Sequence, residues 1–302
     1  MFAGWGKNAL SEFSESAYKF LAIAQKDFQS AVKTKRFIIV GVIFVLFALV
    51  GAYYGNVDVA RSISPISGAP NPATQPVNYA ISVSYSYSEA ILTILALALS
   101  YDALTGERSA RTLAQLVVRP ITRRTILLGK FVAYLTASGG LFVVTTLVLY
   151  AGLCLIMRTV PSSSDVDYLI LSMGIILLYV MSFIAIGLLI SSLTRTSLDS
   201  LLGAVFVWIL LLVFTYAGVA LGLGAINLSA TSDIPYTQFP GYAKILLWIN
   251  PGSHNVAVQS LAGDFSKLTS GLNYTANVIF LIASIIVPLI PAYYFFKRSD
   301  AV

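Results

Sequence analysis

Charged residues are scarce in this sequence. Only 11% of its 302 residues are Asp, Glu, Lys or Arg, whereas 57% are hydrophobic. A soluble domain of this length would need far more charge on its surface, so the composition predicts an integral membrane protein. The 19 basic residues are spread along the chain, mainly near the ends of its apolar runs, and do not gather on one soluble face. This placement argues against a nucleic-acid partner.

The residue types used by metal sites and acid–base catalysts are also nearly missing. The single cysteine, Cys154, excludes an internal disulfide and lies in an apolar run, where a packing role is expected. The single histidine, His254, disfavours a histidine-based site, and we interpret it as a residue of the membrane interface. The sequence contains no G-x-x-x-x-G-K-[ST] phosphate-binding loop, because Phe131 follows Gly129-Lys130. We therefore predict no enzymatic activity and no cofactor or metal in this chain.

Long apolar runs predict an all-α membrane protein with six transmembrane helices. A helix rises 1.5 Å per residue, so about 20 apolar residues cross the hydrocarbon core. The segment ISVSYSYS alternates like a strand, but an open strand cannot cross lipid, so it is assigned to the second helix. Residues 1–36 form a separate N-terminal helix region and 37–302 the transmembrane domain. The predicted spans are about 37–54, 80–100, 126–157, 168–190, 200–224 and 275–296.

Glycines and prolines inside these spans predict local features. Gly139-Gly140 can bend the third span. Gly218 and Gly222 form one GxxxG pair, which is a weak signal for close helix packing. Pro288 and Pro291 are expected to kink the last turns of the sixth span.

The region 226–274 is polar and is predicted to lie outside the membrane. The segment 242–250, YAKILLWIN, is apolar but too short to cross, so it is either re-entrant or interfacial. Asn227 and Asn273 each begin an N-x-[ST] sequon, which makes them possible N-glycosylation sites.

Residues 7–34 have the pattern of an amphipathic helix that lies in the membrane interface. Its apolar stripe consists of Leu10, Phe13, Ala17, Phe20, Leu21, Ala24, Phe28 and Ala31. Its polar face consists of Glu12, Glu15, Lys19, Lys26, Asp27 and Lys33.

The basic residues predict the orientation of the chain. With both termini in the cytoplasm, 15 of the 19 Lys and Arg residues lie on the cytoplasmic side. The opposite orientation would invert this ratio, so the positive-inside rule favours a multi-pass plasma-membrane protein with cytoplasmic ends.

One polar stripe follows the second span. Ser82, Ser86, Glu89 and Thr93 are spaced by four, three and four residues, so they share one face of an otherwise apolar helix. The stripe either lines a transport pathway or marks a helix end with Glu89 in headgroup water.

The charged stretch between the second and third spans, residues 101–130, carries the most specific signal. Its pattern is helical and ends at Pro120. It contains Glu107-Arg108, Thr112-Leu113, Pro120-Ile121 and then Leu128-Gly129-Lys130. This order resembles the coupling region of ABC type-2 exporter permeases, although Arg111 stands where that family usually has glycine. The ending FFKRSD, 295–300, is also similar to the family.

The resemblance implies a permease that works with a separate ABC ATPase, which would bind ATP and Mg²⁺, and with a second copy or a related permease. In the family the N-terminal helix also touches the ATPase, whereas a plain membrane-surface anchor is the other interpretation. The expected ATPase-coupling residues are Asp102, Glu107, Arg108, Arg111 and Thr112. We interpret Arg123, Arg124 and Lys130 as headgroup anchors. The alternative function is a non-transporting membrane anchor or scaffold that docks a soluble partner through the same loop.

Overall fold

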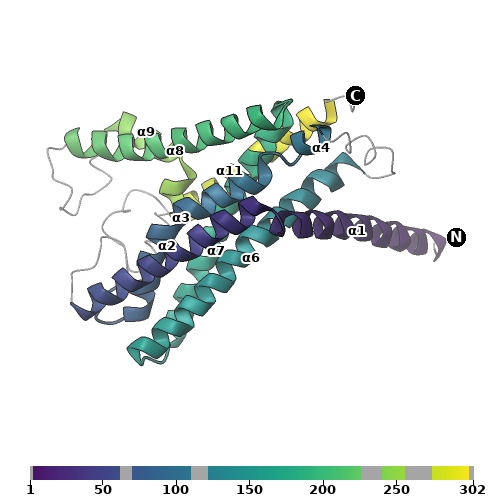
Figure 1. Ribbon diagram of the computed structural model, residues 1–302. Helices are drawn as coiled ribbons and strands as arrows, with labels where there is room; N and C mark the ends of the chain where they lie inside the picture. The colour runs from purple at the N-terminus through teal and green to yellow at the C-terminus, as the bar shows by residue number, and fades with distance from the viewer. Residues whose placement is uncertain (1–2, 62–69, 110–121, 226–239, 256–273, 299–302) are drawn as a thin grey trace.

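The computed structural model describes residues 3–61, 70–109, 122–225, 240–255 and 274–298, and all its regular elements in these ranges are helices (Figure 1). Within them, six helices are long and apolar enough to cross a membrane. The prediction of a helical multi-span protein is therefore confirmed. The predicted sequons at Asn227 and Asn273 lie outside the described residues.

The spanning helices are longer than the apolar runs that predicted them, and polar side chains cap the start of three of them. Thr34 and Thr122 accept hydrogen bonds from the backbone N–H groups of Phe37 and Thr125, and Ser162 forms a capping box with Asp165. The segment that alternates like a strand is helical. The bounds are α2 Lys35–Ala60, α3 Pro76–Ser100, α6 Arg123–Met157, α7 Ser163–Leu193, α8 Ser197–Ala225 and α11 Tyr274–Arg298.

Helices α3 and α7 form the centre of the bundle. In the most apolar 18-residue stretch of each of these two spans, 61% is buried inside the protein, compared with 11% to 28% in the other four spans. Helix α2 packs closely along α3 because it has glycines at the contact. A methyl group at Gly51 would lie 2.6 Å from the Cα of Ser84, and one at Gly55 would lie 2.6 Å from the Cα of Ala80. Only glycine permits this approach.

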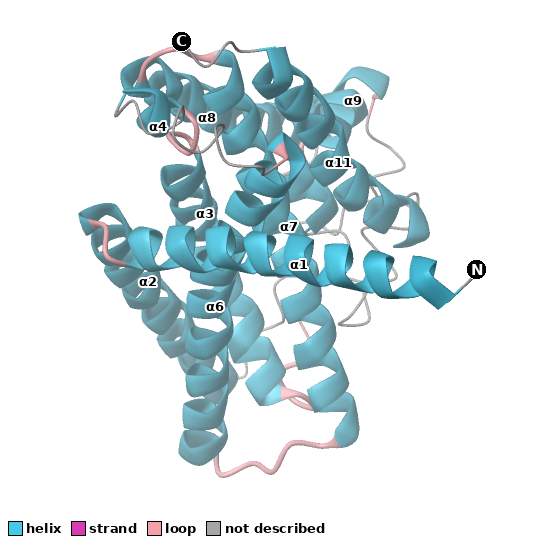
Figure 2. Cartoon of the chain, turned by 90° about the vertical axis from the view of Figure 1, so that its right-hand side faces the viewer, coloured by secondary structure: helices cyan, strands magenta, loops and turns pink. Residues whose placement is uncertain are grey.

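Three shorter or peripheral helices complete the described fold. Helix α1, Ala3–Val32, runs crosswise to α6 and packs against its first half (Figure 2). Helix α4, Thr105–Ser109, follows the end of α3, and α9, Gly241–Ile249, lies along α8. The apolar segment 242–250 is therefore a helix packed on a span, although its depth in the membrane stays a prediction.

Two of the glycines singled out within the spans lie at close contacts between helices. Helix α6 is continuous through Gly139, where a methyl group would lie 2.9 Å from Leu177 of α7. Gly218 of the GxxxG pair faces α9, since a methyl there would lie 2.9 Å from the Cγ of Leu247. Helix α11 also continues through Pro288 and Pro291.

Candidate functional site: a charged junction at one end of the bundle

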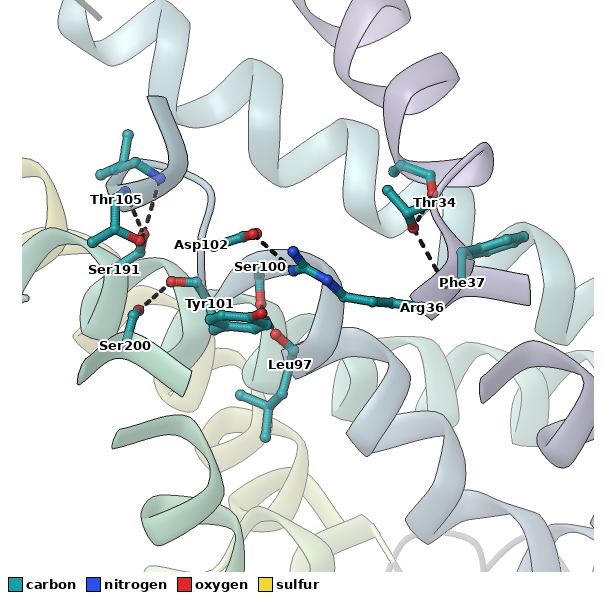
Figure 3. Close-up of polar contacts among 12 residues, drawn as sticks. Thr34, Arg36, Phe37, Leu97, Ser100, Tyr101, Asp102, Thr105, Ser191 and Ser200 are labelled. Carbon is teal, nitrogen blue, oxygen red and sulfur yellow. Dashed lines mark hydrogen bonds and ion pairs between the residues drawn. The ribbon is translucent and has the colours of Figure 1, made fainter. Parts of the chain in front are cut away.

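The charged stretch after α3 is anchored to the bundle by serines of two other helices. The Ser191 hydroxyl of α7 accepts hydrogen bonds from the backbone N–H groups of Leu104, at 2.9 Å, and Thr105, at 3.2 Å (Figure 3). The Ser200 hydroxyl of α8 donates to the carbonyl of Tyr101. Both serines are fully buried, so the turn into α4 is fixed against the junction of α7 and α8.

The charged side chains near α4 form a cluster that we call the charged junction: Asp27, Arg36, Asp102, Glu107, Arg108 and Lys130. Two of the predicted coupling residues have the following partners. The Arg108 guanidinium donates a hydrogen bond of 2.8 Å to the carbonyl of Thr194, at the end of α7. This carbonyl is one that a helix end leaves without an intrahelical partner. Asp102 forms an ion pair of 2.7 Å with Arg36 at the start of α2, and Arg36 also lies over the ring of Tyr101 (Figure 3).

Glu107 and Lys130 are the centre of the junction. The Lys130 ammonium lies 2.9 Å from Glu107 of α4 and 3.0 Å from Asp27 of α1. Only 2% of Lys130 is exposed, so the charge is held inside protein and contacts two carboxylates. The interpretation of Lys130 as a headgroup anchor was therefore wrong. Lysine is buried here because it has carboxylate partners from two other helices.

Asp27 was also placed on the wrong face of the N-terminal helix. The structure buries it beside Ile23, Ala24 and Ala31, which lie three or four residues away on the face that packs against α6. That spacing was the signal that the sequence analysis missed. Gly129, just before Lys130, makes the contact close, because a methyl group there would lie 2.9 Å from a side-chain carbon of Ile23. Gly129 and Lys130 therefore both position α1. Gly129 permits its close packing, and Lys130 forms the ion pair with Asp27.

The junction borders a small cleft between α1, α2 and α3. Its lining includes Asp27, Thr34, Arg36 and Asp102, together with Tyr134 of α6. Of the five predicted coupling residues, Asp102, Glu107 and Arg108 thus lie in one charged region. Arg111 and Thr112 lie outside the described residues.

Two further basic residues at the start of α6 contact the last helix. Arg123 donates a hydrogen bond of 2.6 Å to the carbonyl of Phe296, and Arg124 lies over the ring of Tyr293. Their predicted headgroup role stays a prediction, but both side chains also have protein partners. These contacts connect the end of α11 to the start of α6.

The polar stripe of α3 divides into two parts. The hydroxyls of Ser82 and Ser86 donate to carbonyls of their own helix, and Ser86 is exposed. Glu89 accepts a hydrogen bond of 2.9 Å from Asn255, which follows α9. Thr93 is buried and accepts a hydrogen bond from the Trp208 indole of α8. At the Thr93 end, α8 thus contacts the stripe through Trp208, whereas Ser86 toward the other end is exposed.

His254 is a buried structural residue, contrary to its interpretation as an interfacial one. Its two ring nitrogens lie 2.6 Å from the Asn277 amide oxygen and 2.9 Å from the carbonyl of Trp248. Its ring stacks on Phe280 of α11, with 3.8 Å between ring centres. The polar contacts explain why a histidine is tolerated with only 2% of its surface exposed.

The sequence matches the family model described as "ABC-2 family transporter protein" over residues 21–301. This range covers the whole junction and all six spans. The chain belongs to the ABC-2 transporter family. A comparison with curated proteins finds no significant match. Members of the ABC-2 family are the membrane components of transporters, so the chain is a multi-pass permease, and membership implies association with an ABC ATPase, typically in a dimeric arrangement.

Proposed function

We propose that this ABC-2 protein is the membrane-spanning subunit of an ATP-driven exporter in the plasma membrane, with both termini in the cytoplasm. A separate ATPase subunit, which binds ATP and Mg²⁺, docks on the charged junction. Its closure on ATP moves a hydrophobic or amphipathic substrate outward between two permease copies, or between this chain and a related one.

The observation that carries the proposal is the connection of α4 to four other helices. Lys130 joins α4 to α1 and α6, while Ser191 and Arg108 join the same segment to α7 and Ser200 joins it to α8. A displacement of α4 by a soluble partner would therefore act on the bundle through several short polar contacts at once. Ser109, the last residue of α4, is exposed and lies where such a partner could reach it.

The internal bonds of Glu107 change how the coupling role has to be tested. A charge reversal, Glu107→Lys, would place a second ammonium beside Lys130 and would disturb α1 even if no ATPase bound there. Substitutions at Ser109 avoid this problem, because its exposed side chain lies at the rim of the junction.

The orientation can be tested with two cysteines in a Cys154→Ala background. Ser109→Cys lies at the α4 end, whereas Val160→Cys lies in the turn between α6 and α7, at the opposite end of the 35-residue helix α6 (Figure 2). Val160 is 92% exposed. We expect a membrane-impermeant maleimide to label Val160→Cys in intact cells, and Ser109→Cys only after permeabilisation. The reverse pattern would exclude docking of a cytoplasmic ATPase on α4.

The coupling itself can be tested with tagged chain purified from its own cells in mild detergent. We expect an ABC ATPase to copurify, and a crosslinker on Ser109→Cys to join the two chains, whereas Val160→Cys does not. In vesicles we expect ATP hydrolysis by this ATPase to change severalfold when the permease is present. A crosslinked partner with no ATPase activity would instead support the scaffold function.

A further inference from the structure

Glu89 is an acidic residue at the middle of the central helix. It lies 13 residues from Pro76 and 11 residues from Ser100, the two ends of α3. At 1.5 Å per residue, this places it about 20 Å and about 17 Å from the ends, close to the midplane of a bilayer whose hydrocarbon core is about 30 Å thick. The alternative that Glu89 sits in headgroup water therefore does not fit the length of α3.

A carboxylate at this depth is costly in lipid and normally has a functional partner. Two of the helices that pack against α3 do not supply a cation. Helices α7 and α8, which both pack against α3, contain no lysine or arginine along their whole lengths. Among the described residues, the only hydrogen-bond or ion-pair partner of the Glu89 carboxylate is the neutral amide of Asn255, at 2.9 Å. The carboxyl group is therefore oriented by Asn255 and has no cation partner among the described residues.

Glu89 also lies at a partly exposed position of α3. Its neighbours Ser86 and Ala90 on the same part of α3 are exposed. Asn255 is fully buried, so the amide holds the carboxylate from the protein side. Trp208 closes the stripe about one turn away, at Thr93. The site thus combines one acidic side chain that has no described cation partner with apolar and aromatic neighbours on α3 and α8.

We propose that Glu89, held by Asn255, is the charge-recognition point of the transport pathway and selects amphipathic organic cations. This inference rests on the proposed exporter function and names its substrate class. A cation with an apolar body would compensate the carboxylate and pack against the apolar face of α3. A neutral or anionic molecule of the same shape would leave Glu89 uncompensated or repel it.

Two ions of nearly the same shape and opposite charge can test this: tetraphenylphosphonium and tetraphenylborate. Binding of each is measured by equilibrium dialysis against the purified chain in neutral-lipid nanodiscs, with empty nanodiscs subtracted. We expect tetraphenylphosphonium to bind the unmodified chain and to lose at least tenfold in affinity, about 1.4 kcal/mol, with Glu89→Gln. Glutamine keeps the hydrogen bond from Asn255, so the fold should survive, and tetraphenylborate should bind Glu89→Gln no more weakly than the unmodified chain.

Asn255→Ala separates recognition from a structural role. It removes the amide but leaves the charge, so tetraphenylphosphonium should bind it within about threefold of the unmodified chain. Three results would overturn the inference: no tetraphenylphosphonium binding to the unmodified chain, equal binding to Glu89→Gln, or an equal loss with Asn255→Ala. The measurement uses neither ATP nor an ATPase. Its failure therefore leaves the exporter proposal standing, whereas a failure of the ATPase experiment would leave Glu89 as a cation-binding residue without a transport role.

Discussion

Replacing Lys130 by methionine should detach α1 from the transmembrane bundle. The side chain of Lys130 is 3% exposed, and those of Asp27 and Glu107 are 9% and 15% exposed. Removing the ammonium leaves two neighbouring carboxylates that repel each other in a poorly solvated place. Breaking a buried ion pair in this way typically costs about 3–5 kcal/mol. Because Glu107 is somewhat more exposed than the others, we expect the lower part of this range, about 3 kcal/mol.

The assay is thermal unfolding of the purified chain in detergent, followed by size-exclusion chromatography, with limited trypsin digestion as a second measurement. Lys33 and Lys35 flank the turn between α1 and α2 and are exposed, so loss of the α1 contact should speed cleavage there. Arg124→Met is the matched control. Arg124 is exposed and lies over Tyr293, so its loss should cost at most about 1 kcal/mol.

A triple variant tests the electrostatic explanation. Asp27→Asn, Glu107→Gln and Lys130→Met together remove all three charges, and replacing a complete buried charge cluster is often nearly neutral. We expect the triple variant to recover at least half of the stability lost in Lys130→Met. If Lys130→Met resembled Arg124→Met, or if the triple variant were less stable than Lys130→Met, the account of the junction as a compensated charge cluster would be refuted.

Three further predictions concern packing and polar contacts; the first is measured by the yield of monodisperse protein and the other two by the same unfolding assay. Gly51→Leu should prevent α2 from approaching α3 and sharply reduce the yield of monodisperse protein. Gly152→Leu is the control, because Gly152 has open space around it and its yield should not fall. Equal yields of the two variants would contradict the close-packing argument. Arg36→Ala and Asp102→Asn should show a coupling of about 0.2–1 kcal/mol in a double-mutant cycle, since Arg36 is 46% exposed, and a coupling near 3 kcal/mol would be unexpected. His254→Ala should cost about 1–3 kcal/mol, because it removes a hydrogen bond to the buried Asn277 amide oxygen and the stacking on Phe280; an unchanged melting temperature would show that this cluster is not structural.

The helical spans could be predicted from the sequence because membrane crossing imposes a local rule. Backbone groups in lipid must be paired within one segment, so a long apolar run has few alternatives to a helix. This is why ISVSYSYS could be assigned to α3 despite its alternation. The family resemblance of 101–130 was likewise carried by the order of residues along the chain, and the family match over 21–301 confirmed it.

Partners of charged side chains could not be predicted in the same way. Lys130 was placed among headgroup anchors because a basic residue at the start of a span usually has that role. Its actual partners, Asp27 and Glu107, lie 103 and 23 residues away. The same is true of Ser191 and Ser200, which have no sequence signal and yet hold the turn into α4. For His254, the buried site depends on Asn277 and Phe280 of another helix.

The sequence by itself determined that the chain is a helical membrane protein of six spans, and which stretch carries the family pattern, because hydrophobicity and helix period are properties of neighbouring residues. Only the tertiary structure decided that α4 is tied to α1, α6, α7 and α8, and that Glu89 has an amide partner and, within the described ranges, no cation partner. Those facts depend on which helices lie side by side, and burial makes each such contact matter, since a charge removed from water must find its partner in space.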